Sequence, residues 1–257
     1  MKRIILAALA AVAAIFSGMS QTKEVFPING EAKLTVYHPE SPNGAILMAC
    51  PGGGYSHLAI NHEGHNMAPW FTSEGFTYAV LEYRMPKVAL DTLPILDSRA
   101  ALALLADKAE GWNVNPGKIG IMGSSAGGHL AAYTANTDSL VSFQVLLYPV
   151  ISMDKAVTHM GTHNNLIGED ADAATEAHFT PSERVHAGSP KAFIVLSADD
   201  RVVVPANSMG YAQALISAGV PVEMHMYPTG GHGWGYRSEF KYHKDWTAAL
   251  TEWLRKL

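Results

Sequence analysis

The feature that most constrains the fold is a regular alternation of short apolar runs with longer stretches of helical period. The runs are rich in β-branched and aromatic residues, as strands are, and lie at 34–37, 45–49, 77–83, 119–122, 143–147, 193–196 and 222–227. Helices are expected at 94–109, 126–134, 206–218 and 243–256. Most runs are apolar nearly throughout, which is typical of buried parallel strands. The alternation predicts an α/β fold in a single domain, with a mostly parallel central sheet flanked by helices on both faces.

One interval departs from this alternation. Between residues 152 and 189 polar and small residues dominate, and no segment has the pattern of a strand. Loops of this length in a compact domain are usually functional. We therefore expect a lid-like insertion over the strand ends, within a domain that extends from residue 21 to residue 257.

The N-terminal segment is predicted to be a separate unit. Two basic residues precede an apolar run at 4–16, and the small residues Gly18 and Ser20 follow. This pattern is typical of a secretory signal peptide, and the run is shorter than the roughly 20 residues of a membrane-spanning helix. We expect residues 1–20 to be removed before Gln21, and the mature protein to be exported to the periplasm or the medium without a membrane anchor. A retained anchor is the alternative.

Composition limits the classes of partner. The chain has 48% apolar and 16% charged residues, so a sizeable core is available, and Cys50 is its only cysteine. Removal of Lys2 and Arg3 with the signal peptide changes the formal charge from −5 to −7. This acidic excess argues against nucleic acid or an anionic membrane surface as a partner. The sequence does not indicate an oligomeric state.

The strongest chemical signal is the sequence Gly-Ser-Ser-Ala-Gly at 123–127. It directly follows one apolar run and directly precedes a predicted helix, which is the context of a nucleophile elbow. Glycines are needed there because a side chain at either flank of so tight a turn would collide with the neighbouring strand or helix. Ser125, and not Ser124, lies between the two glycines. The motif therefore predicts Ser125 as a nucleophile, with an incidental turn as the alternative.

A serine nucleophile requires a base to accept its proton, and histidine is suited to this role. Where a nucleophile elbow is present, an acidic residue and then a histidine follow the serine along the chain. His232 meets this order, because it lies after the last predicted strand with glycines on both sides. His225 lies within that strand and His243 begins the last helix, so both are expected to be structural.

The acidic member must be chosen from two neighbours. Asp199 and Asp200 both follow the apolar run at 193–196. Asp200 stands immediately before the sequence Arg-Val-Val-Val at 201–204, at the offset usual for such an acid. We assign Asp200 to orient His232 and Asp199 to turn formation or capping.

The anion of a tetrahedral intermediate needs preorganised hydrogen-bond donors. One is usually the backbone N–H of the residue after the nucleophile, which here is Ala126. The others should come from the loop after an early strand, and three glycines at 52–54 follow the run at 45–49 closely. We expect Gly53 and Gly54 to be these donors, with a plain flexible turn as the alternative.

These segments together resemble the bacterial acetylxylan esterase and feruloyl esterase branch of the α/β-hydrolases. The resemblance covers about residues 46–254 and is carried by Cys50-Pro51-Gly52-Gly53-Gly54-Tyr55, Glu82-Tyr83-Arg84-Met85-Pro86, Gly123-Ser124-Ser125-Ala126-Gly127-Gly128-His129-Leu130-Ala131, Asn165-Leu166-Ile167-Gly168-Glu169, Asp199-Asp200 and Gly230-Gly231-His232-Gly233-Trp234-Gly235. Pro51 stands where many esterases have histidine, which leaves open how the oxyanion loop is held.

The resemblance implies an α/β-hydrolase fold and ester hydrolysis through an acyl-enzyme, without a cofactor. It favours acetyl groups on plant polysaccharide or its oligosaccharides as the substrate. Feruloyl esters and general short-chain carboxylic esters are the alternatives.

Two rival functions come from other classes. A serine peptidase of the prolyl oligopeptidase type shares this catalytic domain, but such enzymes usually add a large recognition module, for which we expect no room. A catalytically silent binding module would usually lack one member of the triad, and all three are present here.

Three further residues are candidates for contacts with the substrate. Tyr55 and Trp234 flank the oxyanion and base segments, and bulky rings there would shorten the acyl pocket. Trp234 could equally pack under its loop. Glu63 could bind a sugar hydroxyl or cap a helix.

The remaining histidines carry weaker signals. His57, His62 and His65 cluster around Glu63, but their spacing fits no zinc signature, and we expect no metal. His159 and His163 are expected on the solvated surface of the insertion.

Overall fold

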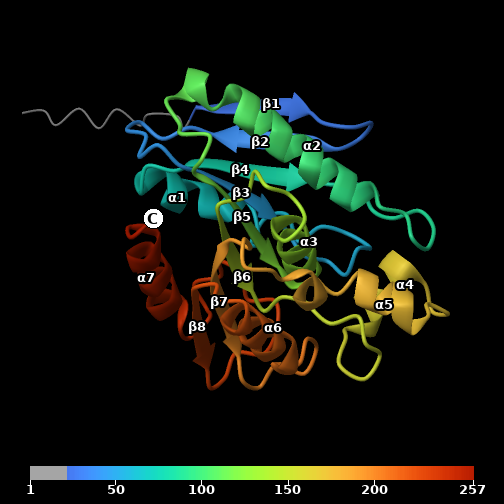
Figure 1. Ribbon diagram of the computed structural model, residues 1–257. Helices are drawn as coiled ribbons and strands as arrows, with labels where there is room; N and C mark the ends of the chain where they lie inside the picture. Colours follow the sequence, from blue (N-terminus) through green and yellow to red (C-terminus); the bar gives the residue numbers. More distant parts are fainter. Residues whose placement is uncertain (1–21) are drawn as a thin grey trace, which may run out of the picture.

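The structure, a computed structural model, describes residues 22–257, so the predicted signal peptide lies outside the described residues. Eight strands form one sheet in the order β1-β2-β4-β3-β5-β6-β7-β8 (Figure 1). They are β1 (Lys23–Pro27), β2 (Lys33–Tyr37), β3 (Ile46–Cys50), β4 (Thr77–Glu82), β5 (Ile119–Ser124), β6 (Phe143–Leu147), β7 (Lys191–Ser197) and β8 (Val222–Tyr227). Strands β3 to β8 are parallel, whereas β1 and β2 are antiparallel to their neighbours. The predicted α/β-hydrolase fold with its mostly parallel sheet is confirmed.

Helices cover both faces of this sheet. They are α1 (Ala68–Ser73), α2 (Leu93–Lys108), α3 (Ser125–Ala135), α4 (Met160–Ile167), α5 (Ala173–His178), α6 (Ala206–Ser217) and α7 (His243–Leu254). Helices α1 and α7 lie on one face, where the rings of Trp70 and Trp246 meet edge to face at 5.4 Å. Helices α2 and α3 pack against each other on the opposite face, and α6 lies on that face beside β7 and β8 (Figure 1).

Helix α3 occupies the centre of the molecule, and all of its residues are buried. Its sequence, Ser-Ala-Gly-Gly-His-Leu-Ala-Ala-Tyr-Thr-Ala, is rich in small residues. These allow a close approach to β5 and to the loop after β6, because a Cβ atom on Gly128 would lie 2.7 Å from the Cβ of Pro149. The start of α3 is therefore held in one position relative to the strand ends.

The segment from 152 to 189 contains two short helices, α4 and α5, and a 3₁₀ turn at Pro181–Arg184, but no strand. It lies on the side of the molecule toward which the parallel strands point (Figure 1). Its function as a lid remains a prediction. Among residues 22–257 no helix has the length and apolar character required to span a bilayer.

Candidate active site

The turn between β5 and α3 places Ser125 at the carboxyl edge of the sheet. Its backbone has φ = 53°, a left-handed conformation that is unusual for a residue other than glycine. A Cβ atom on Gly123 would lie 2.1 Å from the carbonyl oxygen of Gly127, and one on Gly127 would lie 2.1 Å from that of Cys50. Glycine is therefore required at both flanks of this turn, as the motif predicted.

Three side chains predicted from the sequence meet at this edge. His232 Nε2 lies 2.8 Å from Ser125 Oγ, and His232 Nδ1 lies 2.7 Å from Asp200 Oδ2. Asp200 is buried, and its other oxygen accepts hydrogen bonds from the backbone N–H groups of Val202 and Val203. A carboxylate held in this way fixes Nδ1 of His232 as a donor, which leaves Nε2 able to accept a proton from Ser125.

The neighbouring Asp199 has a different place. It is exposed, and its carboxylate accepts a hydrogen bond of 2.8 Å from the backbone N–H of Gly231. This N–H group lowers the pKa of Asp199 below its ordinary value. The structure thus brings Asp200, and not Asp199, to the imidazole, while Asp199 stabilises the loop that carries it.

Two of the three expected anion donors border the same space, and the third directly follows Ser125. Gly53 and Gly54 have positive φ angles and line the cleft with Ser125. The Gly53 carbonyl accepts from Ser56 and the Gly54 carbonyl accepts from the side chain of Asn165, so the carbonyls of both glycines are engaged elsewhere. Ala126 lies in the first turn of α3, where a backbone N–H has no acceptor within the helix.

Two side chains hold the start of the oxyanion loop at Pro51, where many esterases have a histidine. The hydroxyl of Tyr83 donates to the carbonyl of Pro51 at 2.6 Å, and a carboxylate oxygen of Glu63 accepts from the N–H of Gly52 at 2.7 Å. These two bonds hold the start of the oxyanion loop without a histidine. The sequence contained no signal that would identify either partner.

Glu63 links two loops of the site and does not cap a helix. It is 3% exposed, and both of its oxygens are engaged, one by Gly52 and the other by the Tyr148 hydroxyl at 2.7 Å. Burial, and then the Glu63 carboxylate, raise the pKa of Tyr148 well above its ordinary value, so the hydroxyl keeps its proton and donates a hydrogen bond to Glu63. The same hydroxyl accepts from the N–H of Gly235. Glu63 therefore joins the oxyanion loop to the loop of His232, and the expectation that it caps a helix is wrong. Glu63 also lines the cleft, so its contact with a sugar hydroxyl stays a prediction.

The expectation that Tyr55 walls the substrate pocket is also wrong. Its side chain is 1% exposed, and its hydroxyl lies 2.8 Å from Nδ1 of His129. Nε2 of His129 lies 2.6 Å from the carbonyl of Phe179, to which it donates. Burial lowers the pKa of His129 to about 4, so this imidazole is neutral and accepts from Tyr55 at Nδ1. Tyr55 thus packs in the core beneath the cleft.

Trp234 packs under its loop, which was the other possibility for this residue. It is 5% exposed, it stacks on Phe240 with ring centroids 4.2 Å apart, and its Nε1–H donates to Ser197 Oγ. It also meets the ring of Tyr148 edge to face. The expectation of a direct substrate contact is therefore corrected, because the ring supports the loop of His232 from within the core.

We expect Trp234→Ala to lower the activity toward acetate and butyrate esters by similar factors. The substitution removes a large buried ring, which typically costs about 3–5 kcal/mol of stability, and loosens the loop that carries His232. The measurement is kcat/KM for p-nitrophenyl acetate and butyrate together with the melting temperature. A selective gain toward butyrate would contradict this position for the ring.

The cleft above Ser125 has a volume of about 360 Å³, and its lining consists mainly of histidine and glycine residues, whose carbon atoms form most of the exposed surface. Besides Ser125 and His232 it contains the rings of His57, His62 and His159. Burial is the main cause of the lowered pKa values of His62 and His159, so both are neutral near pH 7. Within residues 22–257 no group of three or more His, Cys, Asp and Glu side chains has the arrangement of a metal site.

His159 and His163 were both expected on the solvated surface of the insertion, and neither lies there fully exposed. His163 is fully buried and its ring faces Asn164 and Glu176, whereas His159 borders the cleft. The sequence missed His159 as a site residue, because only the folded insertion brings residue 159 to Ser125.

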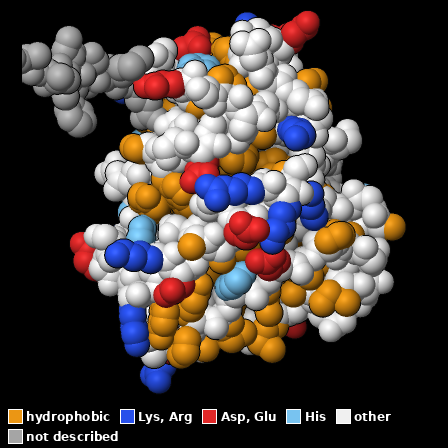
Figure 2. Space-filling model, turned by 90° about the vertical axis from the view of Figure 1, so that its left-hand side faces the viewer, with side chains coloured by type: hydrophobic (Ala, Val, Ile, Leu, Met, Phe, Trp, Pro, Cys, Tyr) orange, Lys and Arg blue, Asp and Glu red, His pale blue; other side chains and the backbone are white. Residues whose placement is uncertain are grey.

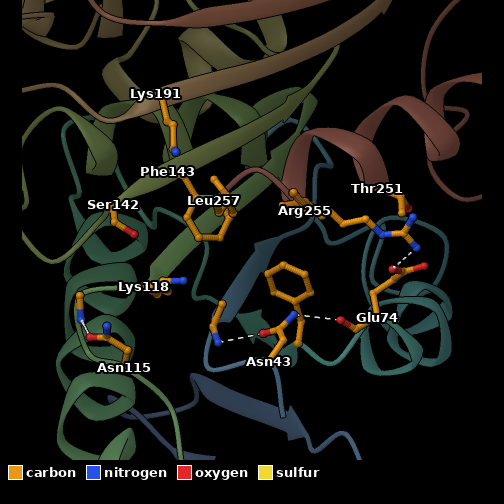
Figure 3. A pocket seen from close by; sticks show the side chains of 14 residues that line it. Asn43, Glu74, Asn115, Lys118, Ser142, Phe143, Lys191, Thr251, Arg255 and Leu257 are labelled. Atoms are coloured by element: carbon orange, nitrogen blue, oxygen red, sulfur yellow. Dashed lines mark hydrogen bonds and ion pairs between the residues drawn. The ribbon is translucent and has the colours of Figure 1, made fainter. Parts of the chain in front are cut away.

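A larger pocket, of about 550 Å³, lies at the opposite edge of the sheet, where β3, β5 and β7 begin (Figure 3). Arg255 and Glu74 form an ion pair of 3.0 Å at its border. Basic and acidic side chains are interspersed on the side of the molecule that carries α7 (Figure 2). This pocket contains none of the predicted site residues, so the smaller cleft is the candidate active site.

Comparison with known proteins agrees with this geometry. The model of the prolyl oligopeptidase family matches residues 97–257, well over half of the chain. The chain belongs to this family. In solved structures it is similar to an acetyl ester-xyloside bifunctional hydrolase from Caldicellulosiruptor lactoaceticus, with 32% identity, a TM-score of 0.83 and 88% of each chain covered.

Two curated relatives are longer proteins. An acetylxylan esterase from Xylanibacter ruminicola is 35% identical over 93% of this chain, which spans 52% of that protein. An endo-1,4-beta-xylanase B from Butyrivibrio fibrisolvens is 28% identical over 76% of this chain, an alignment that spans 33% of that protein. The chain thus spans about half or less of the length of these two relatives. The resemblance to acetylxylan esterases is confirmed.

Proposed function

We propose that this protein is a serine carboxyl-ester hydrolase. The observation that carries the proposal is the hydrogen-bonded series from Asp200 through His232 to Ser125, which ends in a cleft bordered by Gly53 and Gly54. A nucleophile, a base, an orienting acid and backbone donors are the parts required for acyl transfer.

The reaction has two steps. His232 accepts the proton of Ser125 as its oxygen attacks the ester carbonyl, and the N–H groups of Gly53, Gly54 and Ala126 stabilise the resulting anion. The alcohol leaves with the proton from His232, which leaves an acyl-enzyme on Ser125. Water, deprotonated by His232, then releases the acid and restores the serine. Asp200 keeps the imidazole oriented and stabilises its charged form.

The proposed substrate is an acetyl ester on a plant polysaccharide or its oligosaccharides. Three relatives support this choice, since their names refer to acetylxylan, xylanase and acetyl ester-xyloside activities. The cleft supports it as well, because the nitrogens of its histidine rings can form hydrogen bonds with a hydroxyl-rich alcohol group. Feruloyl and general short-chain esters remain the alternatives.

A short acyl group is expected because the cleft offers few apolar side chains to a longer chain, and not because the rings of Tyr55 and Trp234 shorten the pocket. The cleft is lined by few apolar side chains, among them Ala59 and Val202, of which Val202 is 50% exposed. A long acyl chain would stay in water and lose about 0.8 kcal/mol for each CH₂ left unburied. We expect p-nitrophenyl acetate to be cleaved at least as efficiently as butyrate and far better than octanoate. A preference for octanoate would overturn the short-acyl proposal.

The natural substrate can be identified by product analysis. Incubation with acetylated xylan, acetylated pectin and methyl ferulate should release acetate from the acetylated polysaccharide and little ferulate. Predominant release of ferulate would favour the feruloyl alternative.

Peptide hydrolysis is the rival function that family membership raises. Peptide p-nitroanilides distinguish the two, because an amide needs a protonated amine as its leaving group and a peptide needs recognition along the chain. We expect no turnover of these amides at enzyme concentrations that hydrolyse p-nitrophenyl acetate within minutes. Turnover of both at similar efficiency would favour a peptidase.

Export of the protein is also part of the proposal. In a secreting host we expect the mature protein to begin at Gln21, because Gly18 and Ser20 provide the small residues that signal peptidase requires. N-terminal sequencing of the exported protein measures this directly. A protein that keeps its N-terminus and sediments with membranes would show that the segment is an anchor.

A further inference from the structure

One ring nitrogen of His159 forms hydrogen bonds within the protein, and the other forms none with the described residues. The backbone N–H of Thr162 donates to Nδ1 at 3.2 Å, and the Thr162 hydroxyl lies 2.9 Å from the same atom. His159 is thus the N-cap of α4. Because a backbone N–H can only donate, Nδ1 must accept, and the proton of a neutral ring is on Nε2. No described residue hydrogen-bonds to Nε2.

This ring lies beside the reacting groups. It lines the cleft that contains Ser125 and His232, and its Cε1 atom would be 3.8 Å from a Cβ atom on Gly54 in the oxyanion loop. Asn165, six residues further along the chain and near the end of α4, donates to the Gly54 carbonyl at 2.7 Å. Asn165 therefore anchors α4 to the oxyanion loop, and His159, the N-cap of this helix, places Nε2–H as a fixed donor at the cleft.

The chemistry of an acetyl ester limits what this donor can meet. Beyond its carbonyl, an acetyl group has only a methyl, which accepts no hydrogen bond. The carbonyl oxygen is assigned to the donors of Gly53, Gly54 and Ala126. The bridging oxygen of the ester is assigned to His232, which protonates it as the alcohol leaves. The remaining acceptors of the substrate are the hydroxyl and ring oxygens of the sugar that carries the ester.

We infer that Nε2–H of His159 forms a subsite that binds an oxygen of the sugar next to the scissile acetyl ester. This inference rests on the proposed function. It makes His159 a specificity-determining residue, which selects acetylated sugars over acetyl esters of apolar alcohols.

The experiment compares two alkyl acetates of similar ring size. One is methyl β-xyloside carrying a single acetyl group, and the other is cyclohexyl acetate, which has neither hydroxyl nor ring oxygen. We expect His159→Asn to lower kcat/KM for the xyloside about 5- to 10-fold, the range of one lost hydrogen bond, and to leave cyclohexyl acetate within twofold.

The variants separate the proposed binding of the sugar by His159 from its role as the N-cap of α4. Asparagine is a good N-cap, so His159→Asn keeps an acceptor for Thr162 but does not reach the position of Nε2. Glutamine reaches further with an N–H donor, so we expect His159→Gln to retain part of the preference for the xyloside. His186→Asn is the matched control, because its Nδ1 also accepts a backbone N–H, from Gly188, but it lies outside the cleft.

Each outcome has one meaning. If His159→Asn lowers both acetates equally, or neither, or if His186→Asn has the same effect as His159→Asn, the sugar subsite is disproved. If the unsubstituted protein hydrolyses neither acetate nor p-nitrophenyl acetate, the proposed esterase function fails instead. Melting temperatures of the three variants verify that each is folded.

Discussion

We expect Ser125→Ala to lower kcat for p-nitrophenyl acetate by on the order of 10⁶-fold, the loss found when a triad serine is removed. Ser125 Oγ is the hydroxyl that lies within hydrogen-bond distance of His232 Nε2, at 2.8 Å, so the variant lacks the oxygen that this base activates. Alanine occupies less space and retains the Cβ atom, so the fold should be unchanged. The measurement is the steady-state rate against a circular dichroism control for folding.

Two further variants test whether the residues act as a unit. Ser125→Ala combined with His232→Ala should be no slower than Ser125→Ala alone, since a base has no function without its nucleophile. Ser124→Ala, one residue away and buried, is the matched control and should retain most of the activity. Strong activity in Ser125→Ala, or its loss only in Ser124→Ala, would show that the nucleophile is wrongly assigned.

The second large effect is expected for Asp200→Asn, which should lower kcat by about 10⁴-fold. The amide can donate to Nδ1 of His232, so the imidazole would adopt the tautomer that carries its proton on Nε2. It could then no longer accept the proton of Ser125. The buried carboxylate that stabilises the charged imidazole is also lost.

Asp199→Asn is the matched control for this prediction. Asparagine keeps an oxygen that can accept the N–H of Gly231, so the loop should be preserved and kcat should change much less. Measured side by side with p-nitrophenyl acetate, the two variants decide the assignment. A greater loss in Asp199→Asn than in Asp200→Asn would contradict it.

The sheet was predictable because its central strands are buried on both faces. All seven predicted strands form, and the four predicted helices begin and end within two residues of the expected positions. Strand β1 was missed because it lies at the edge of the sheet, and most of its residues are exposed and carry no apolar pattern. Helix α1 and the helices of the insertion were missed because each has only six to eight residues. Such lengths give little periodicity.

The reacting residues could be predicted because their positions follow from local rules. Glycines flank Ser125 where no Cβ atom fits, and His232 follows the last strand, as the order of the triad requires. The choice between Asp199 and Asp200 as the acidic member of the triad was less certain from the sequence. It depended on the valine run, whose N–H groups the structure places on Asp200.

The walls of the site could not be predicted, since they depend on packing between distant segments. Nearness in sequence suggested Tyr55 and Trp234, but both rings turn into the core, toward His129 and Phe240. Glu63 binds Tyr148, which is 85 residues away along the chain.

The sequence by itself therefore determined the alternation of strand and helix and the order of nucleophile, acid and base, because burial and backbone sterics act within a few residues. Only the tertiary structure decided how the proline-containing oxyanion loop is held and which imidazole of the insertion reaches the cleft. Those contacts join segments that meet only when the parallel strands align their carboxyl ends at one edge.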